Sequence, residues 1–202
     1  WFESEINRND YSIFVVSGFI CWNFFSSAVS GSGISMVNNS TIIKKIYFPR
    51  LIIPISSALS AMFDFIVCLC IYLGFIFFFK NVEIRILDIF LIPISALLLF
   101  FSAFGIGTLI SALAVKYRDF RYILPFILQL LLFISPVFLL ISPNSSTFFL
   151  FSLNPLVAPL QMFRYHLTHT IQWDAILISI LSNFFLLFLG LRIFKKMEDY
   201  FA

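Results

Sequence analysis

Charged side chains are scarce in this sequence. Lys, Arg, Asp and Glu make up 11% of its 202 residues, whereas a soluble domain carries about 25%. Apolar residues make up 61%, and the mean hydropathy is +1.02. This composition excludes a soluble globular domain and indicates an integral membrane protein. The net charge of +3 is small and unevenly placed, so it reports membrane orientation and argues against a nucleic-acid partner.

Catalytic and metal-binding motifs are also lacking. The sequence has no phosphate loop, dinucleotide fingerprint, zinc-protease motif or paired nucleophile and base. Cys21, Cys68 and Cys70 all lie inside apolar runs, where buried small side chains are expected. His166 and His169 have helical ligand spacing, but no carboxylate or cysteine lies near them in the sequence, so we expect surface histidines and no metal. Without an enzyme site or cofactor, the chain either conducts passively or takes energy from a partner.

Five long apolar runs account for most of the chain. They cover residues 11–37, 51–79, 89–115, 122–141 and 173–194. Each reaches or exceeds the roughly 20 residues that a helix needs to cross the hydrocarbon. None alternates with the period of a strand. The sequence therefore predicts an all-α, polytopic helical bundle in which residues 1–202 form a single transmembrane domain.

Basic residues gather in one set of connecting segments. That set holds Lys44, Lys45, Arg50, Lys116, Arg118, Arg121, Arg192, Lys195 and Lys196, whereas the opposite set holds only Arg8, Lys80, Arg85 and Arg164. The richer side is expected to be cytoplasmic, which places the C-terminus inside and the first residue outside. The chain begins without Met or a signal peptide. We therefore expect a missing N-terminal segment with one further span, giving six in the complete protein.

Residues 38–50 form the most polar interruption between two runs. On a helical wheel one face carries the apolar side chains and the other the basic ones: Ile42, Ile43, Ile46 and Tyr47 against Lys44 and Lys45. Asn39, Ser40 or Thr41 can cap the start of this helix, and Phe48 before Pro49 ends it. The pattern predicts a short amphipathic helix between two spans. Periodicity alone fits a part that transmits force and a basic loop anchored at the headgroups equally well.

Residues 142–172 are mixed in character. Asn154 and Pro155 form a turn-type break between two apolar pieces, residues 147–151 and 156–163, each too short to cross a bilayer. Short helices that dip into the outer leaflet and return fit this pattern, because irregular backbone at that depth needs cover from protein. A loop lying on the outer surface is the alternative.

A few polar residues interrupt the spans. Asp64 lies near the middle of one, where a charge costs about 2.5–3.5 kcal/mol, so it must pair within the bundle or line a hydrophilic path. Asn23, Gln129 and Asn183 allow the same two readings, and interhelical hydrogen bonds are expected for them. The small residues Ala103, Gly107 and Ser111 recur every fourth position and predict close helix contact. Pro136 after Ser135 is expected to kink the fourth span, as a hinge or as a shape for packing.

The chain resembles the permease subunits of type-2 ABC exporters that export O-antigen, capsular polysaccharide or teichoic acid. The resemblance runs nearly end to end. It rests on residues 18–26 (GFICWNFFS), 43–50 (IKKIYFPR) after Asn38, 105–107 (GIG) and 116–125 (KYRDFRYILP), and continues through 135–137 (SPV), Asn154-Pro155 with Arg164, and the closing residues 190–202.

The resemblance implies roles for several segments. The family's coupling helix, which docks on a separate ATP-binding subunit, matches Asn38, Ile42, Ile43, Lys44, Lys45, Ile46, Tyr47, Phe48, Pro49 and Arg50. A second cytoplasmic loop matches Lys116, Tyr117, Arg118, Asp119 and Arg121. Short re-entrant helices around Asn154, Pro155 and Arg164 would gate the outer end. Candidates to line the channel are Trp22, Phe24, Phe25 and Asp64.

The same resemblance implies partners. A second permease copy and two ATPase chains, which carry ATP and Mg, would complete the exporter in the bacterial inner membrane, and its substrate would be a lipid-linked glycan. Aromatic side chains suit such a path because sugar rings can lie on them. A type-2 exporter of a drug or lipid, a membrane-embedded glycosyl- or acyltransferase and a passive channel remain as alternatives.

Overall fold

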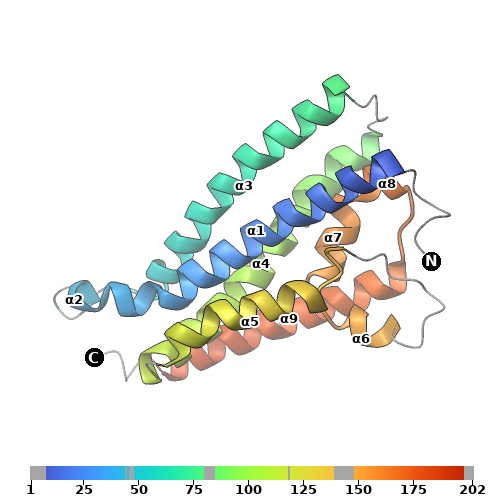
Figure 1. Ribbon diagram of the computed structural model, residues 1–202. Coiled ribbons are helices and arrows are strands. Elements are labelled where there is room, and N and C mark those ends of the chain that lie inside the picture. Colours follow the sequence, from blue (N-terminus) through green and yellow to red (C-terminus); the bar gives the residue numbers. More distant parts are fainter. Residues whose placement is uncertain are drawn as a thin grey trace.

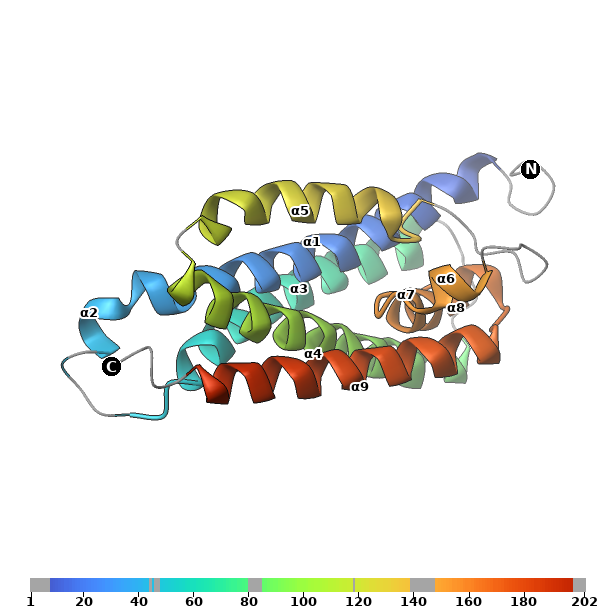
Figure 2. The same ribbon diagram turned by 90° about the horizontal axis from the view of Figure 1, so that it is seen from below.

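The computed structural model describes residues 8–43, 45, 48–79, 85–117, 119–138 and 148–197. Within these ranges every regular element is a helix. Four helices are long and apolar enough to cross a membrane: α1 (Arg8–Asn38), α3 (Ile52–Phe79), α4 (Ile86–Lys116) and α9 (Trp173–Lys196). They lie side by side, with α4 against α1 on one side and against α9 on another (Figures 1 and 2). The all-α membrane fold is thus confirmed.

The fourth expected span ends early. Helix α5 covers Phe120–Ile134, about 22 Å at the helical rise of about 1.5 Å per residue, so it is shorter than the hydrocarbon core. Ser135 leaves the helix with φ −79° and ψ 147°, because the following proline disfavours the α region for this residue. A break therefore replaces the expected kink, and the prediction of one helical span over 122–141 is wrong.

The short amphipathic helix between the first two long helices is described in part. Helix α2 covers Ser40–Ile43 and follows α1 after a single turn residue, Asn39. The amide of Lys45 donates to the carbonyl of Ile42 over 3.0 Å, a three-residue bond that tightens the end of the last turn. A short helix therefore occurs where the sequence predicts one, and Lys45 already lies in a turn; residues 44, 46 and 47 lie outside the described residues.

Small residues allow α4 to approach both neighbours closely. A Cβ on Gly107 would lie 2.7 Å from the Cβ of Ser32 in α1, and one on Gly105 would lie 2.7 Å from the Cα of Leu187 in α9. Ala103 and Ser111 are fully buried. The predicted close helix contact is confirmed, and it makes α4 the central helix of the described bundle.

One of the three polar residues expected to bridge helices does so. Asn183 of α9 donates through Nδ2 to the carbonyl of Leu98 (3.0 Å) and to the hydroxyl of Ser102 (2.5 Å), both in α4. Asn23 and Gln129 are exposed, and their side chains bond to nothing in the described part of the chain. The interhelical bonds expected for these two are therefore not formed.

Three short helices cover one end of the bundle: α6 (Phe148–Ser152), α7 (Val157–Phe163) and α8 (Tyr165–Thr168). Helix α7 packs against α4 and α9 and is almost wholly buried. Figure 1 shows these helices near the start of α1, whereas α2 and the end of α9 lie at the opposite end. We call the two ends the α7 end and the α2 end. Because α7 is helical and buried, the alternative of a loop lying on the outer surface does not fit this segment.

Candidate functional site

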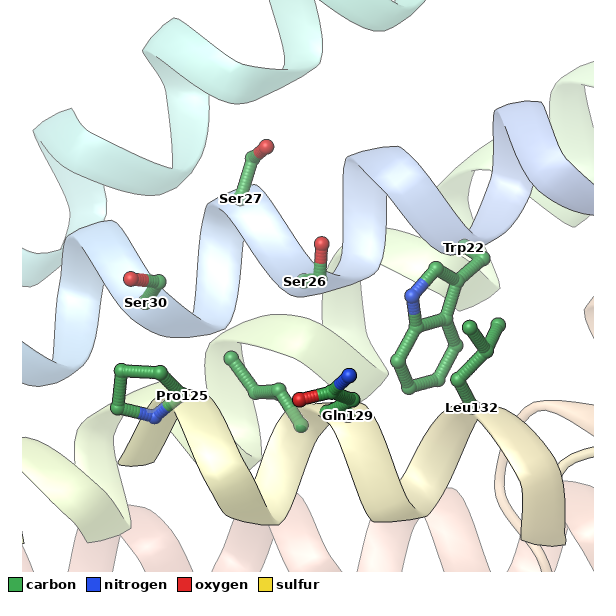
Figure 3. Close-up of a pocket in the computed structure, with 8 residues that line it drawn as sticks. Trp22, Ser26, Ser27, Ser30, Pro125, Gln129 and Leu132 are labelled. Atoms are coloured by element: carbon green, nitrogen blue, oxygen red, sulfur yellow. The ribbon is translucent and has the colours of Figure 1, made fainter. Parts of the chain in front are cut away.

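A groove of about 530 Å³ lies between α1 and α5. Its walls are Trp22, Ser26, Ser27 and Ser30 from α1 and Pro125, Leu128, Gln129 and Leu132 from α5. The two helices run in opposite directions, so Trp22 lies near Leu132 toward the α7 end and Ser30 lies near Pro125 toward the α2 end (Figure 3). The groove therefore follows the long axis of the bundle.

The groove combines polar and apolar residues and carries no charge. Three serine hydroxyls and the Gln129 amide can donate and accept hydrogen bonds, and no lining residue is ionisable at neutral pH. The Trp22 ring and the Gln129 amide point into the space between the two helices (Figure 3). Trp22 is held in place by the ring of Phe25, whose centroid lies 5.5 Å away. Such a surface suits a neutral ligand that is rich in hydroxyl groups.

Of the four channel-lining candidates, only Trp22 reaches this groove. Phe24 and Phe25 lie two and three residues further along α1, where the helical turn directs them into the core, and both are buried. The ring of Phe24 packs against Phe65 at a centroid distance of 5.2 Å. Asp64 lies on α3, exposed and without a partner among the described residues, so the pairing expected within the bundle is not formed in this chain.

The sequence analysis missed the serines, and for Gln129 it favoured an interhelical hydrogen bond over a place along a hydrophilic path. Ser26 and Ser30 lie four residues apart and therefore share one face of α1 with Trp22. That spacing of small polar residues in an apolar run was the available signal. The partner wall could not be found in this way, because α5 lies about a hundred residues away in the chain.

The α2 end gathers exposed basic side chains. Lys45, Lys116, Lys195 and Lys196 are exposed there. In the second loop Tyr117 and Asp119 are exposed and Arg121 is partly buried, whereas Arg118 lies outside the described residues. The ammonium of Lys116 lies 5.2 Å from the centre of the Tyr117 ring. The resulting surface is positive and suits an acidic or phosphate-rich partner surface.

Helix α2 is anchored on this end by part of its apolar face. Ile43 and Phe48 pack against a cluster of Met36, Ile53, Ala112 and Phe194, which joins α1, α3, α4 and α9. Ile42 points away and is 48% exposed. Asn38 is the last residue of α1, and Pro49 and Arg50 lie in the turn before α3. The segment thus packs on a cluster to which all four long helices contribute, while Ile42 stays exposed.

At the α7 end, Asn154 organises the break between α6 and α7. Its Oδ1 accepts from the amide of Leu156 (3.0 Å), and its Nδ2 donates to the hydroxyl of Ser135 (3.1 Å) after α5. Its backbone carbonyl accepts from Ser179 of α9 (2.8 Å). The carbonyl of Pro155 accepts from Ser102 of α4 (3.3 Å). The predicted gate residues therefore connect three helices.

The two predicted surface histidines differ. His169 is exposed, with a left-handed φ of 51°. His166 is 2% exposed, so its expected surface position is wrong. It is buried where α8 packs against α4 and α7, and its Nε2 lies 3.0 Å from the hydroxyl of Tyr72 in α3. No cluster of three or more possible metal ligands occurs in the part of the chain that the structure describes.

The fold defines a multi-pass membrane protein with a groove of polar and apolar residues between α1 and α5. The sequence profile of the family described as "ABC-2 type transporter" matches residues 2–168. Because the match covers most of the chain, the protein belongs to the ABC-2 type transporter family.

Individual relatives carry more specific names. The chain is 26% identical over 195 residues to an O-antigen export system permease protein RfbA of Klebsiella pneumoniae, covering 96% of this chain and 75% of the relative. A second Klebsiella pneumoniae protein of that name is 25% identical with the same coverage. A Myxococcus xanthus protein of that name is 23% identical over 155 residues, covering 75% of this chain and 59% of the relative.

Proposed function

We propose that this chain is the membrane-spanning permease subunit of an ATP-driven exporter that moves a lipid-linked polysaccharide across the bacterial inner membrane. The observation that carries the proposal is the groove between α1 and α5, with hydroxyls, an amide and an indole and no charged lining residue. A glycan offers hydroxyl groups for the first two and apolar ring faces for the third. The names of the three relatives support the same substrate class.

The ends of the bundle take opposite sides of the membrane in this proposal. Exposed lysines gather at the α2 end, and the side rich in Lys and Arg faces the cytoplasm. The C-terminus would therefore be cytoplasmic and α6–α8 periplasmic. A separate ATPase, which carries ATP and Mg, would bind at α2 and at the loop of Lys116, Tyr117 and Asp119. Its closure would displace α2 and, through Ile43, the cluster that joins the four long helices.

A second copy of the chain completes the passage. The groove is open along one side of the described chain, and α3 and α5 carry many exposed apolar residues, among them Phe63, Ile71, Phe126, Leu130 and Phe133. Lipid covers such surfaces in part. Two copies that meet along their grooves would enclose a path lined on both sides by hydroxyls and aromatic rings. The buried α7 would then gate that path at its periplasmic end.

The proposal is tested by deleting this gene in the bacterium that carries it. Loss of polysaccharide from the cell surface, with lipid-linked glycan accumulating on the cytoplasmic side, is expected, and wild-type protein should restore export. Within the groove, Gln129→Leu and Ser30→Val should reduce export. Asn23→Leu, at another exposed polar position of α1 that does not line the groove, is the matched control. Unchanged surface polysaccharide together with increased drug sensitivity would instead identify a drug exporter.

A further inference from the structure

Arg164 is a buried cation outside the groove. It lies between α7 and α8 and is 4% exposed. A buried guanidinium is ordinarily matched by a carboxylate, but none lies among its partners in the described part of the chain. Its partners are Pro136, Val137, Phe14 and Ser17. Arg164 is therefore matched by dipoles rather than by an opposite charge.

The guanidinium joins two segments that are distant in sequence. Nη1 donates to the carbonyl of Pro136 (2.9 Å), and Nη2 donates to the carbonyl of Val137. Both carbonyls belong to the turn that follows α5. Nη2 also donates to the carbonyl of Phe14 (3.2 Å), and Nε donates to the hydroxyl of Ser17 (3.3 Å), both in α1. One side chain thus holds the end of α5 onto α1.

Helix α1 is shaped for this contact. The centre of the Phe14 ring lies 3.7 Å from the Cζ of Arg164, a cation–π arrangement. A Cβ on Gly18 would collide with Nη2 of Arg164 and would lie 2.7 Å from the carbonyl oxygen of Val137. Only glycine at this position lets the guanidinium and the carbonyl reach the helix surface together. We call Arg164, Phe14, Ser17, Gly18 and the turn 135–137 the Arg164 junction.

The junction lies directly beyond one end of the groove. Gly18 precedes Trp22 by one helical turn of α1, and Ser135 follows Leu132 by three residues in α5. Trp22 and Leu132 are the groove residues nearest the α7 end. The two walls of the groove are therefore held together at that end by a residue that belongs to neither wall.

We infer that Arg164 is a positioning residue that acts as a latch: it holds α5 against α1 at the α7 end of the groove and releases α5 when the passage opens. A buried cation is stable only while its donors are satisfied. Partial separation of α5 from α1 would leave the guanidinium with unmatched donors, so the junction favours a fully bonded and a released arrangement over intermediate ones. The inference rests on the proposed function in one respect: the groove is taken to be the path of the glycan.

The test measures groove accessibility in the assembled exporter in intact cells. Single cysteines replace Gln129 or Ser30 in a background that lacks Cys21, Cys68 and Cys70, and a membrane-impermeant maleimide is added outside. Arg164→Met keeps an unbranched apolar stem and removes every donor. Gly18→Ala pushes the guanidinium away while favouring the helix. Both should increase the labelling rate by roughly tenfold, the factor that loss of one charge-assisted hydrogen bond produces.

Two further variants distinguish a contact that opens during transport from a contact that only stabilises the fold. Arg164→Lys keeps the charge with fewer donors and should give an intermediate labelling rate. Gly31→Ala is the matched control on α1, because its Cβ would meet only the Cβ of Ser57 at 3.6 Å, and it should label as the wild type does. If Arg164→Met fails to accumulate, Gly18→Ala and Arg164→Lys decide the question by the same criterion.

Wild-type labelling rates in Arg164→Met and Gly18→Ala would overturn the latch, as would a lower amount of protein with unchanged labelling of the folded fraction. The measurement requires no transported substrate. If labelling increases in the variants as expected but deletion of the gene leaves surface polysaccharide unchanged, the proposed function is wrong and the latch is not. If the wild-type protein exports polysaccharide but labelling is unchanged in Arg164→Met and Gly18→Ala, the latch is wrong and the proposed function is not.

Discussion

Gly190 of α9 lies against the carbonyl of Gly105 in α4, so closely that a Cβ on Gly190 would collide with that oxygen. The same Cβ would lie 2.6 Å from the hydroxyl of Thr108. The two helices therefore meet backbone to backbone. In a membrane, where lipid is as apolar as the helix surface, close packing of this kind supplies much of the force that holds helices together.

Gly190→Ala should destabilise the protein by about 1–3 kcal/mol, the usual cost of overpacking a tight contact. The transition temperature of the purified protein in detergent measures this effect. Gly74→Ala is the control, because nothing lies within 4 Å of its added Cβ; it should be neutral or slightly stabilising. Equal transition temperatures for Gly190→Ala and the wild type would contradict the close contact.

Asp64 has no partner in the described chain, so its replacement should leave folding of the single chain intact. Asp64→Asn and Asp64→Leu are both expected to accumulate in membranes at wild-type levels. If the carboxylate serves the assembled passage, both variants should lose export, and Asp64→Glu should retain it in part. A lower amount of Asp64→Leu alone would show instead that Asp64 pairs within the bundle.

The α2 end allows energy coupling to be separated from folding. Ile42 and Lys45 are exposed, so Ile42→Asp and Lys45→Glu should abolish export while the protein remains folded. Ile43 packs against the cluster that contains Met36 and Phe194, and Ile43→Asp should lower the folded amount as well. Co-purification with the ATPase measures docking. If the Ile42→Asp variant and the Lys45→Glu variant both export normally, this segment has no coupling role.

The short helices at the α7 end should differ in water access. Leu156 and Leu160 are buried (3% and 2% exposed), whereas Leu150 is 70% exposed. Single cysteines at Leu156 and Leu160 should resist an external thiol reagent, and a cysteine at Leu150 should react. Trapping the ATPase with nucleotide should raise labelling at the two buried positions if α7 is a gate. Rapid labelling of both in every state would point to an exposed loop.

His166 makes stability depend on pH. Burial lowers its pKa below the usual value, against the opposing effect of Asp88. The unfolded chain therefore binds a proton at a higher pH than the folded chain, and stability should fall as the pH drops through about 6.5, the usual value for histidine. The loss of stability is measured as the difference between the transition temperatures at pH 7.5 and pH 5.5. His166→Gln should reduce this difference. His169→Asn, at an exposed left-handed position that asparagine tolerates, should keep it.

Hydropathy and length predict the long helices well. The runs at 11–37, 51–79, 89–115 and 173–194 correspond to α1, α3, α4 and α9 within a few residues, because each must satisfy its own backbone in lipid. The end of α5 was misjudged, although Ser135-Pro136 carried the signal. Side-chain positions around Trp22 were predicted less well, since residue type alone does not tell which face of α1 meets α5.

The Arg164 junction could not be predicted, for a different reason. Its partners lie 27 and 28 residues away at Val137 and Pro136, and 147 and 150 residues away at Ser17 and Phe14. No local periodicity connects such positions. The resemblance drew attention to Gly18, Ser135 and Arg164 separately, but only the fold brings them to one place.

Helix α1 extends without a proline for 31 residues, about 46 Å at the helical rise of about 1.5 Å per residue. Near its C-terminal end Met36 belongs to the cluster on which Ile43 packs, and in its N-terminal half Gly18 lies beside Arg164. In a straight helix the angle between these two contacts is set by residue count alone. Adding one residue between Gly18 and Met36 would rotate the Gly18 contact by about 100° around the helix axis relative to the Met36 contact. The number of residues between Gly18 and Met36 is therefore under stricter constraint than the exposed side chains along the way.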